Sequence, residues 1–572
     1  MKVDLLIKDI KVYNSYLKKF SNADIAILNG KFLYIGKKDS HKFQPQDIID
    51  GRNNHMIPGL IDIHMHIESS MATPYYFSEG VARRGVTTIV SEPHEIANVL
   101  GREGVIEMIK ASEGCSIDIY YGVPSSVPST NPQMETTGGL IEVPDVQELM
   151  KLERVKCLGE VMNYVDVIKD EDSKIRQIID FTLKNHPEKL IEGHCPQLSG
   201  LDLAKFIYRG IDSDHTQQSV DGMLERVSNG MFIEIQEKSI NKEIVDCIKD
   251  NNILEYISLT TDDVMANDFV EKGHMDHLVK KIIDAGLSLE EAIYIATYTP
   301  ARRMRMYDRG VIAPGKIADF VIIKDIKTMD ISKTYKAGKL IYNKDEEKKI
   351  KSNTYKFPKH FYETVKLKPL KKENFELKTI DKSLKEVSCR VIGVQDQTTY
   401  TKEIIKKLSV IDGKVVWEDS DNCLIGVFER YGKKDTSTLG LITGNTIKRG
   451  AVATTYAHDH HNLLVIGKNI DDMILAANSV IESQGGYCAV ENGKILAKID
   501  LPIGGILSEL PMNELGTQLN KVVTAIRKLG YEHKNPIMSL STNTLPVSPS
   551  IKITDIGLMD VKKGEVVSLF TS

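Results

Sequence analysis

Between residues 58 and about 300, the chain alternates short apolar runs with longer amphipathic segments. The apolar run at residues 85–90 (GVTTIV) is followed by helical spacing at 104–111 (GVIEMIKA), and the run at 155–160 (VKCLGE) is followed by a helical pattern at 174–184 (KIRQIIDFTLK). Repeated strand–helix units with short connections predict an α/β fold with a parallel sheet. The pattern alone allows either a closed barrel or an open, doubly wound sheet.

Strand-rich segments flank this region on both sides. Within residues 26–35, two apolar runs are joined by Asn29-Gly30, which is a hairpin signal. Residues 315–323 (GKIADFVII) return to strand character. The stretch 344–378 is rich in Lys and Glu and poor in apolar periodicity, so it is either a linker or a solvated loop inside one domain.

A second folded region is expected from residue 379 to the end. Asp412-Gly413 and Asn492-Gly493 mark two further hairpin turns of the same kind. Residues 471–482 (DDMILAANSVIE) have helical spacing and an acidic start, which suits a helix N-terminus. This region therefore mixes strands with at least one helix.

The composition excludes several classes of protein. The formal net charge is −5, without the basic excess that is usual in nucleic-acid binders. The seven cysteines contain no C-x-x-C pair, which favours a reducing compartment over a disulfide scaffold. No apolar stretch reaches the ~18 residues of a membrane span, and the first residues do not form a signal peptide. We therefore expect a cytoplasmic protein that binds neither nucleic acid nor membrane.

The most informative motif is residues 58–66 (PGLIDIHMH), where an apolar run ends in His-x-His. On a strand, residues i and i+2 point to the same face, so the imidazoles of His64 and His66 converge. Two neutral imidazoles at a strand end are a good beginning for a divalent transition-metal site. A chance pair on a solvated strand is the alternative.

Further candidate ligands follow later apolar runs. Glu160, His194, His215 and the pair Asp262-Asp263 each lie just past such a run. These are the positions at which the loops of a parallel barrel build active sites. Each residue taken singly could be a capping or hydrogen-bonded side chain. The ordered series of His-x-His, Glu, His, His and Asp indicates a metal centre instead.

Three other groups of polar residues could face the same site. Glu92, His94 and Glu95 follow the run that ends at residue 90, and packing of the loop is the alternative role. His274 lies in the last long loop before residue 300. Residues 458–462 (HDHHN) are either an exposed polar cluster or a segment that helps to close the site.

The ordered series resembles the amidohydrolase superfamily of metal-dependent hydrolases. Residues 313–321 (APGKIADFV) are similar to a segment that is usual in that superfamily. The resemblance implies a (β/α)8 TIM-like barrel at residues 59–302, with a small β-sandwich subdomain built from residues 1–58 and 303–343. A linker at 344–378 and an additional C-terminal α+β domain at 379–572 would complete the chain.

The resemblance narrows to the bacterial adenine deaminases. The matching motifs before residue 300 lie at residues 91–99 (SEPHEIANV), 193–196 (GHCP), 213–215 (SDH), 261–263 (TDD) and 273–276 (GHMD). Those in the C-terminal region lie at residues 457–462, 501–505 and 553–558. Two positions depart from that family's pattern, because Thr216 replaces a usual Glu and the segment that contains Gln236 lacks a usual Arg.

The resemblance implies two divalent metal ions per subunit, Mn²⁺ or Fe²⁺, with Zn²⁺ also compatible. It assigns His64, His66 and Asp262 to one ion and His194 and His215 to the second, with Glu160 as the bridge. Glu is anionic at neutral pH, which suits a bridge between two cations. Asp262 and Glu160 are the expected catalytic residues, with Asp262 as the proton carrier. The candidate substrate contacts are Glu92, His94, Glu95, Asp263 and His274.

The implied reaction is the hydrolytic deamination of adenine to hypoxanthine and ammonia, with water activated by the two metals. An amidohydrolase acting on another cyclic amidine or amide, such as cytosine or a dihydropyrimidine, is the alternative within the enzyme class. A non-catalytic scaffold on the same barrel is the alternative outside it. We expect a homodimer.

Overall fold

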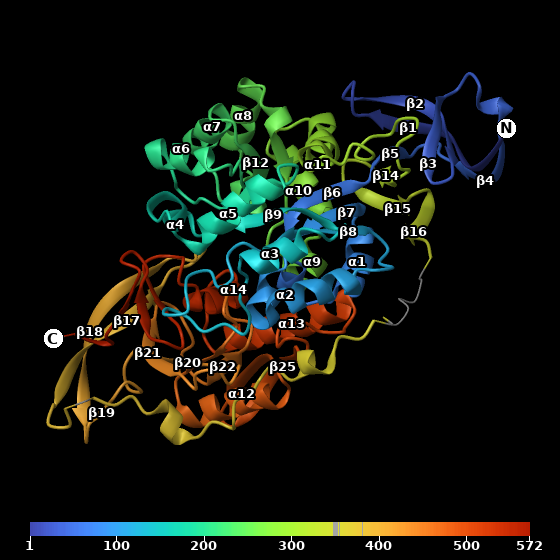
Figure 1. The fold of residues 1–572 in the computed structure, drawn as a ribbon. Helices are drawn as coiled ribbons and strands as arrows, with labels where there is room; N and C mark the ends of the chain where they lie inside the picture. The colour runs from blue at the N-terminus through green and yellow to red at the C-terminus, as the bar shows by residue number, and fades with distance from the viewer. Residues whose placement is uncertain (347–352, 354, 380, 572) are drawn as a thin grey trace.

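A computed structural model describes residues 1–346, 353, 355–379 and 381–571. A central barrel lies between a strand-rich sheet that carries the N-terminus and a larger C-terminal region (Figure 1). Of the linker predicted at 344–378, the structure describes residues 344–346, 353 and 355–378. Residues 347–352 and 354 lie outside the described part.

The barrel strands appear in chain order and run parallel to one another. They are β6 (Leu60–Met65), β7 (Val86–Ser91), β8 (Asp118–Val123), β9 (Val155–Val161), β10 (Leu190–Gly193), β11 (Ser213–Asp214), β12 (Phe232–Ile235) and β13 (Ile257–Leu259). They form a five-stranded sheet, β6 to β10, and a three-stranded sheet, β11 to β13. An isolated parallel bridge between Met65 of β6 and Asp262, just after β13, brings the two ends of the series together. The TIM-like barrel expected from the sequence is therefore confirmed.

The strands form because β-branched and apolar residues dominate runs that are covered on both faces. Every residue of β7 (VTTIVS) is buried, as is typical of a parallel sheet enclosed by helices. The helices of this region are α1 (Pro74–Ala82), α2 (His94–Ala111), α3 (Val143–Leu149), α4 (Tyr164–Lys169), α5 (Lys174–Asn185), α6 (Gly200–Tyr208), α7 (Val220–Ser228), α8 (Lys242–Asp250), α9 (Ala266–Glu271), α10 (Met275–Asp284) and α11 (Leu289–Arg303). The helical patterns at 104–111 and 174–184 are confirmed.

The two flanks of the barrel meet in one eight-stranded sheet. Its strands are β1 (Lys2–Asn14), β2 (Lys19–Leu28), β3 (Lys31–Gly36), β4 (Gln44–Asp50), β5 (His55–Pro58), β14 (Phe320–Asp325), β15 (Asp330–Lys336) and β16 (Lys339–Asn343). Antiparallel pairing of β5 with β14 joins the flanks, and the Asn29-Gly30 turn joins β2 to β3 as predicted. The strand expected from residue 315 begins only at Phe320, because Gly315 adopts a positive φ of 81° in a turn.

The C-terminal region is built on a ten-stranded sheet and a small three-stranded sheet. The strands are β17 (Glu386–Val394), β18 (Thr401–Ile411), β19 (Lys414–Val415), β20 (Cys423–Phe428), β21 (Ser437–Thr443), β22 (Ala451–Thr454), β23 (Leu463–Gly467), β24 (Gly486–Glu491), β25 (Lys494–Asp500), β26 (Ile551–Ile553), β27 (Leu558–Asp560), β28 (Glu565–Val567) and β29 (Phe570–Thr571). The helices are α12 (Ile470–Glu482), α13 (Met512–Lys528) and α14 (Pro536–Ser541). Both further hairpin turns and the helix predicted at 471–482 are confirmed.

The C-terminal region packs directly on the barrel. Helix α13 lies against α9 (Figure 1), and Gly516 permits the close approach because a Cβ there would lie 2.5 Å from the Ala266 carbonyl oxygen. Phe357 and Phe361 are buried in the same core cluster as barrel residues. Among the helices that the structure describes, none has both the length and the apolar composition needed to cross a bilayer.

Candidate metal centre and active site

The six predicted ligands gather at the carboxyl-terminal edge of the barrel. They come from strand ends in chain order: His64 and His66 from β6, Glu160 from β9, His194 after β10, His215 after β11 and Asp262 after β13. All six belong to groups whose ligand atoms lie within 4.8 Å of one another. Parallel strands place their carboxyl ends at one edge, so residues separated by nearly 200 positions meet there.

Glu160 is the centre of the arrangement. Its Oε2 lies 2.8 Å from His194 Nδ1 and 3.2 Å from His215 Nε2. Its Oε1 faces the other side and lies 3.5 Å from His66 Nε2. Burial by itself would raise the pKa of Glu160, but His215 and His194 hold it well below its ordinary value. The carboxylate is therefore ionised, as a bridge between two cations must be.

The two histidines of the His-x-His pair have different neighbours. His64 stacks on His215, with ring centroids 3.8 Å apart, and its Nε2 lies 3.9 Å from Asp262 Oδ1. His66 Nε2 lies 3.4 Å from Asp262 Oδ1 and faces Glu160 on its other side. Asp262 has a φ of 58°, so its backbone turns sharply after β13 and directs the side chain into the centre.

These residues fit a divalent cation. His66 Nδ1 lies 2.9 Å from the Glu92 carbonyl oxygen, which can only accept, so Nδ1 is the protonated nitrogen and Nε2 keeps a lone pair for a metal. Burial and then the neighbouring His215 lower the pKa of His64 well below its ordinary value, so this imidazole is neutral. His64 Nε2 is buried without a hydrogen-bond partner among the described residues. A bound cation would satisfy that nitrogen.

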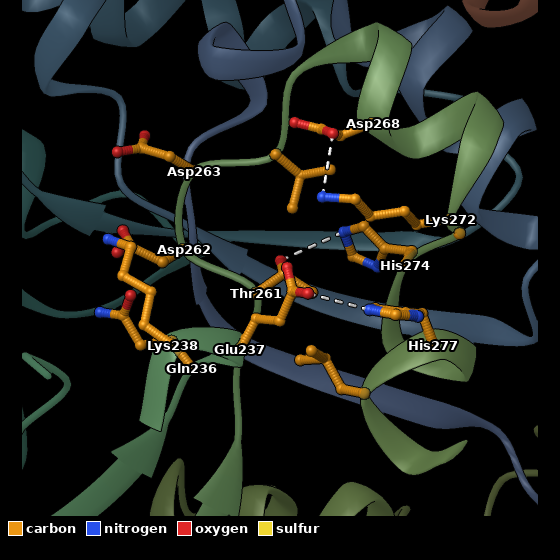
Figure 2. Close-up of a pocket in the computed structure, with 13 residues that line it drawn as sticks. Gln236, Glu237, Lys238, Thr261, Asp262, Asp263, Asp268, Lys272, His274 and His277 are labelled. Carbon is orange, nitrogen blue, oxygen red and sulfur yellow. Dashed lines mark hydrogen bonds and ion pairs between the residues drawn. The ribbon is translucent and has the colours of Figure 1, made fainter. Parts of the chain in front are cut away.

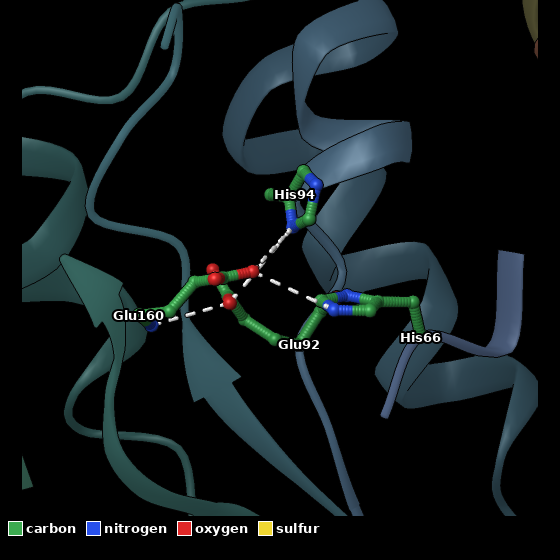
Figure 3. A group of neighbouring side chains, drawn as sticks. All are labelled: His66, Glu92, His94 and Glu160. Atoms are coloured by element: carbon green, nitrogen blue, oxygen red, sulfur yellow. Dashed lines mark hydrogen bonds and ion pairs between the residues drawn. The ribbon is translucent and has the colours of Figure 1, made fainter. Parts of the chain in front are cut away.

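Glu92, His94 and Glu95 lie next to the centre (Figure 3). Glu92 Oε2 accepts a 3.2 Å hydrogen bond from the backbone N–H of Glu160. His94 and Glu95 lie in the first turn of α2, and His94 Nδ1 is 3.7 Å from Glu160 Oε1. The strand end thus continues directly into a helix that carries polar side chains against the centre.

Asp263 and His274 line a pocket that opens beside Asp262 (Figure 2). Asp263 accepts a hydrogen bond from Ser69 Oγ, and His274 Nε2 lies 3.2 Å from Thr261 Oγ1. Side chains that the motifs did not indicate also line this pocket: Gln236, Glu237, Lys238, Asp268, Lys272 and His277. They come from the segment directly after β12 and from the α9–α10 region after β13.

The segment 458–462 is buried, so the exposed cluster that was the alternative interpretation of its sequence is wrong. His458 Nδ1 lies 2.5 Å from Glu95 Oε1, and His461 Nε2 contacts Glu95 Oε2. Asp459 joins His94 and Glu95 in one of the compact polar groups. The C-terminal region therefore reaches the edge of the metal centre.

Buried polar residues behind the ligands escaped the sequence interpretation. Asp62 Oδ1 accepts a 2.9 Å hydrogen bond from Thr260 Oγ1, and it ties β6 to the loop that bears Asp262. The sequence could have indicated Asp62, because residues 62, 64 and 66 alternate along one strand and so point to the same face. Glu234 Oε2 lies 4.0 Å from His64 Nδ1, and no local pattern marked that residue.

The two departures from the expected motifs contact the segment that carries His215. Thr216 Oγ1 donates a 2.8 Å hydrogen bond to Asp214 Oδ2. Gln236 Nε2 donates a 2.6 Å hydrogen bond to the carbonyl oxygen of His215. Both contacts support the loop that carries His215, and neither residue replaces a predicted ligand.

Known proteins resemble this chain over its whole length. A family model described as "Amidohydrolase family" matches residues 55–341, and one described as "Adenine deaminase C-terminal domain" matches residues 398–565. A protein named adenine deaminase from Clostridium perfringens is 50% identical over 573 residues, covering 100% of this chain and 99% of the relative. A protein named adenine deaminase 2 from Shouchella clausii is also 50% identical, covering 100% of both chains.

Among solved structures, a β-aspartyl dipeptidase from Fervidobacterium islandicum is 18% identical with a TM-score of 0.48, covering 60% of this chain and 98% of that one. The assignment rests on the sequence relatives. The chain belongs to the amidohydrolase family and is an enzyme of that metal-dependent superfamily. Within it, the chain is a member of the adenine deaminases.

Proposed function

We propose that this enzyme hydrolyses adenine to hypoxanthine and ammonia. The full-length relatives at 50% identity are named for adenine deamination, and the C-terminal match is to the domain described for the same enzymes. The observation in the chain itself that carries the proposal is that all six predicted ligand positions, Glu160 among them, gather in overlapping compact groups at one edge of the barrel. The relatives do not favour cytosine, a dihydropyrimidine or a non-catalytic scaffold.

In this proposal the centre holds two divalent cations, Mn²⁺ or Fe²⁺, with Zn²⁺ as a further candidate. Imidazole and carboxylate ligands accept all three. Glu160 would hold the cations together with His194 and His215, which lie beside its Oε2. When bound, such cations would supply the activation of water that attack at neutral pH requires.

Asp262 is the proposed proton carrier. Its Oδ1 lies 3.4 Å from His66 Nε2 and 3.9 Å from His64 Nε2, at the mouth of the pocket in Figure 2. Burial acts to raise its pKa, but contact with His66 and the charge of His215 hold the pKa far below its ordinary value, so Asp262 is ionised. Asp262 takes the proton of the attacking water and delivers it to the amine that leaves C6.

Asp263 and His274 are proposed to contact the purine from the pocket side. Ser69 fixes the Asp263 carboxylate, and Thr261 fixes the His274 ring. Attack at C6 requires an electron-poor ring, which a hydrogen bond to N1 provides. Glu92, His94 and Glu95 supply further polar groups next to Glu160.

We further propose a cytoplasmic homodimer in which residues 59–302 form the catalytic domain, 1–58 with 303–343 the small subdomain, and 379–572 the C-terminal domain. Light scattering on the purified enzyme tests the dimer. Limited proteolysis followed by mass spectrometry tests the boundaries, including the linker at 344–378.

The proposed reaction can be tested on a single preparation of the purified enzyme. Metal content is measured first, and ammonia release from adenine, cytosine and adenosine is then compared on the same sample after loading with Mn²⁺. We expect adenine to be by far the best substrate. A metal-replete enzyme that releases no ammonia from adenine would contradict the proposal.

A further inference from the structure

Four buried side chains, two of them from the predicted ligand set, form the most complete polar group at the centre. His66, Glu92, His94 and Glu160 each place one ligand atom within 4.8 Å of all the others, and they point toward one another (Figure 3). His66 and Glu160 belong to the ligand set expected from the sequence. Glu92 and His94 were expected to contact substrate.

The separations in this group are those of ligands around a cation. His66 Nε2 lies 3.5 Å and His94 Nδ1 3.7 Å from Glu160 Oε1, and His94 Nδ1 lies 3.8 Å from Glu92 Oε2. Hydrogen bonds between nitrogen and oxygen are shorter, at about 2.7–3.2 Å. Two ligands at ~2.1 Å from one ion in a tetrahedral arrangement are separated by ~3.4 Å. The observed distances match the second arrangement.

Both imidazoles can present a lone pair to the group. The Glu92 carbonyl oxygen fixes the proton of His66 on Nδ1, which leaves Nε2 free. His94 Nε2 lies 3.7 Å from Glu95 Oε1 on the far side of its ring, and this carboxylate favours the proton there, leaving Nδ1 for the group. A carboxylate behind a histidine is the usual support of a metal ligand.

The group is buried and incompletely satisfied. Glu92 is 4% exposed, and its Oε1 has no hydrogen-bond partner in the described part of the chain. His94 is 5% exposed, and its Nδ1 also lacks a partner among the described residues. The group holds two carboxylates side by side in a buried place, and a divalent cation would neutralise their charge. Burying them without one would be costly.

We propose that Glu92 and His94 are metal ligands, which form a four-ligand cation site together with His66 and Glu160. The proposal deepens the metal-dependent function proposed above and rests on it. His66 also lies beside Asp262, which groups with His64 and His215, so the four-residue site adjoins the rest of the predicted ligand set. Glu92 and His94 thus become part of the metal centre.

The site also connects the C-terminal region to the metal. Glu95, which supports the His94 ring, is itself held by His458 and His461. A ligand on α2 is therefore oriented by residues that lie more than 360 positions away in the sequence. This explains why the buried histidines of segment 458–462 face the barrel.

Metal content of the intact enzyme tests the assignment. Glu92→Gln and His94→Asn variants are loaded with Mn²⁺, desalted and analysed for bound metal per subunit, with circular dichroism as the check on folding. We expect each variant to lose one equivalent, or to bind it at least ~10-fold more weakly. Matched controls are Glu68→Gln and His460→Asn, which are buried residues outside the four-residue group. They should keep the wild-type metal content.

A second variant gives a positive signal that does not depend on catalysis. His94→Cys loaded with Cd²⁺ should show thiolate-to-metal charge-transfer absorption in the ultraviolet that the Cd²⁺-loaded wild type lacks. Absence of this band in a folded protein, together with unchanged metal content in Glu92→Gln and His94→Asn, would overturn the proposal even if adenine is deaminated. Loss of metal in the variants of an enzyme that does not deaminate adenine would instead support the site and reject the proposed reaction.

Discussion

The Glu95 carboxylate, in the first turn of α2, contacts His461 Nε2 from the C-terminal region as a buried hydrogen-bonded pair. His458 Nδ1 lies 2.5 Å from the other oxygen of the same carboxylate. Glu95 in turn faces His94, whose opposite ring nitrogen faces Glu160. A continuous polar path therefore links the C-terminal region to the metal centre.

The first prediction concerns this path. His461→Gln should weaken metal binding by about 10–100-fold, because residues that orient a ligand contribute on that scale. Titration of the metal-free enzyme with Mn²⁺ in a competing chelator measures the affinity. His533→Gln is the control, since His533 is also buried in the C-terminal region but bonds the Gly444 carbonyl oxygen. Equal affinities in both variants would argue against the path.

A second prediction separates proton transfer from metal binding. Asp262→Asn should lower kcat for adenine by about 10²–10⁴-fold, the usual contribution of a positioned proton carrier. Steady-state kinetics on samples with matched metal content makes the measurement. Asp268→Asn is the control, because Asp268 lines the same pocket but pairs with Lys272 rather than with a ligand. A kcat for Asp262→Asn within a few-fold of the wild type would remove the assigned role.

Stability should depend on pH through a buried lysine of β26. Lys552 is fully buried, its Nζ donates to the Thr542 carbonyl oxygen at 2.7 Å, and burial lowers its pKa to about 7. An unfolded lysine has a pKa of about 10.4, so between these values the unfolded chain binds more protons and stability rises with pH. The destabilising contribution is complete below about pH 7 and disappears as the pH rises through this window.

Lys552→Met should therefore flatten the pH dependence of unfolding between about pH 7 and pH 10, with a difference of up to ~1.4 kcal/mol per pH unit. Thermal denaturation of the wild type and the variant across this range supplies the comparison. Lys563→Met, at an exposed position, should leave the slope unchanged. Parallel slopes in the wild type and Lys552→Met would show that Lys552 does not titrate in this window.

The last prediction concerns a buried arginine beside the same path. Arg430 Nη1 donates to Thr364 Oγ1 and Nη2 to the Gly504 carbonyl oxygen, each at 2.8 Å, and Nε donates to the His461 carbonyl oxygen. A lysine ammonium group cannot make these three hydrogen bonds in the plane of a guanidinium group. Arg430→Lys should therefore lower the free energy of unfolding by about 2–4 kcal/mol. Chemical denaturation measures it, with the exposed Arg449→Lys as control. A loss of unfolding free energy no larger than that of Arg449→Lys would contradict this prediction.

Local patterns were sufficient for much of the fold and indicated side chains that the structure brings together at one edge of the barrel. The alternation of apolar runs and amphipathic segments predicted the parallel barrel, and the Asn29-Gly30 turn predicted a hairpin that the structure contains. His64, Glu160 and Asp262 were found because catalytic side chains follow strand ends in such barrels. These features depend on how often apolar residues recur and on where a residue lies within a strand, and both can be recognised in a single sequence.

Other features had no local signal. Burial of His458 and His461 depends on packing against a helix at the opposite end of the chain, so their short polar sequence was equally consistent with an exposed cluster. Glu234, behind His64, carries no motif at all. Such contacts arise when distant segments meet, and neither propensity nor periodicity records which partner a polar residue acquires.

The sequence by itself therefore determined the α/β architecture, the family and the residues at the strand ends, because each depends on short-range order. Only the tertiary structure brought Glu92 and His94 into one compact buried group with His66 and Glu160. The physical reason is that a metal site is defined by separations of a few ångströms between side chains, and these are set by how strands and helices pack in three dimensions.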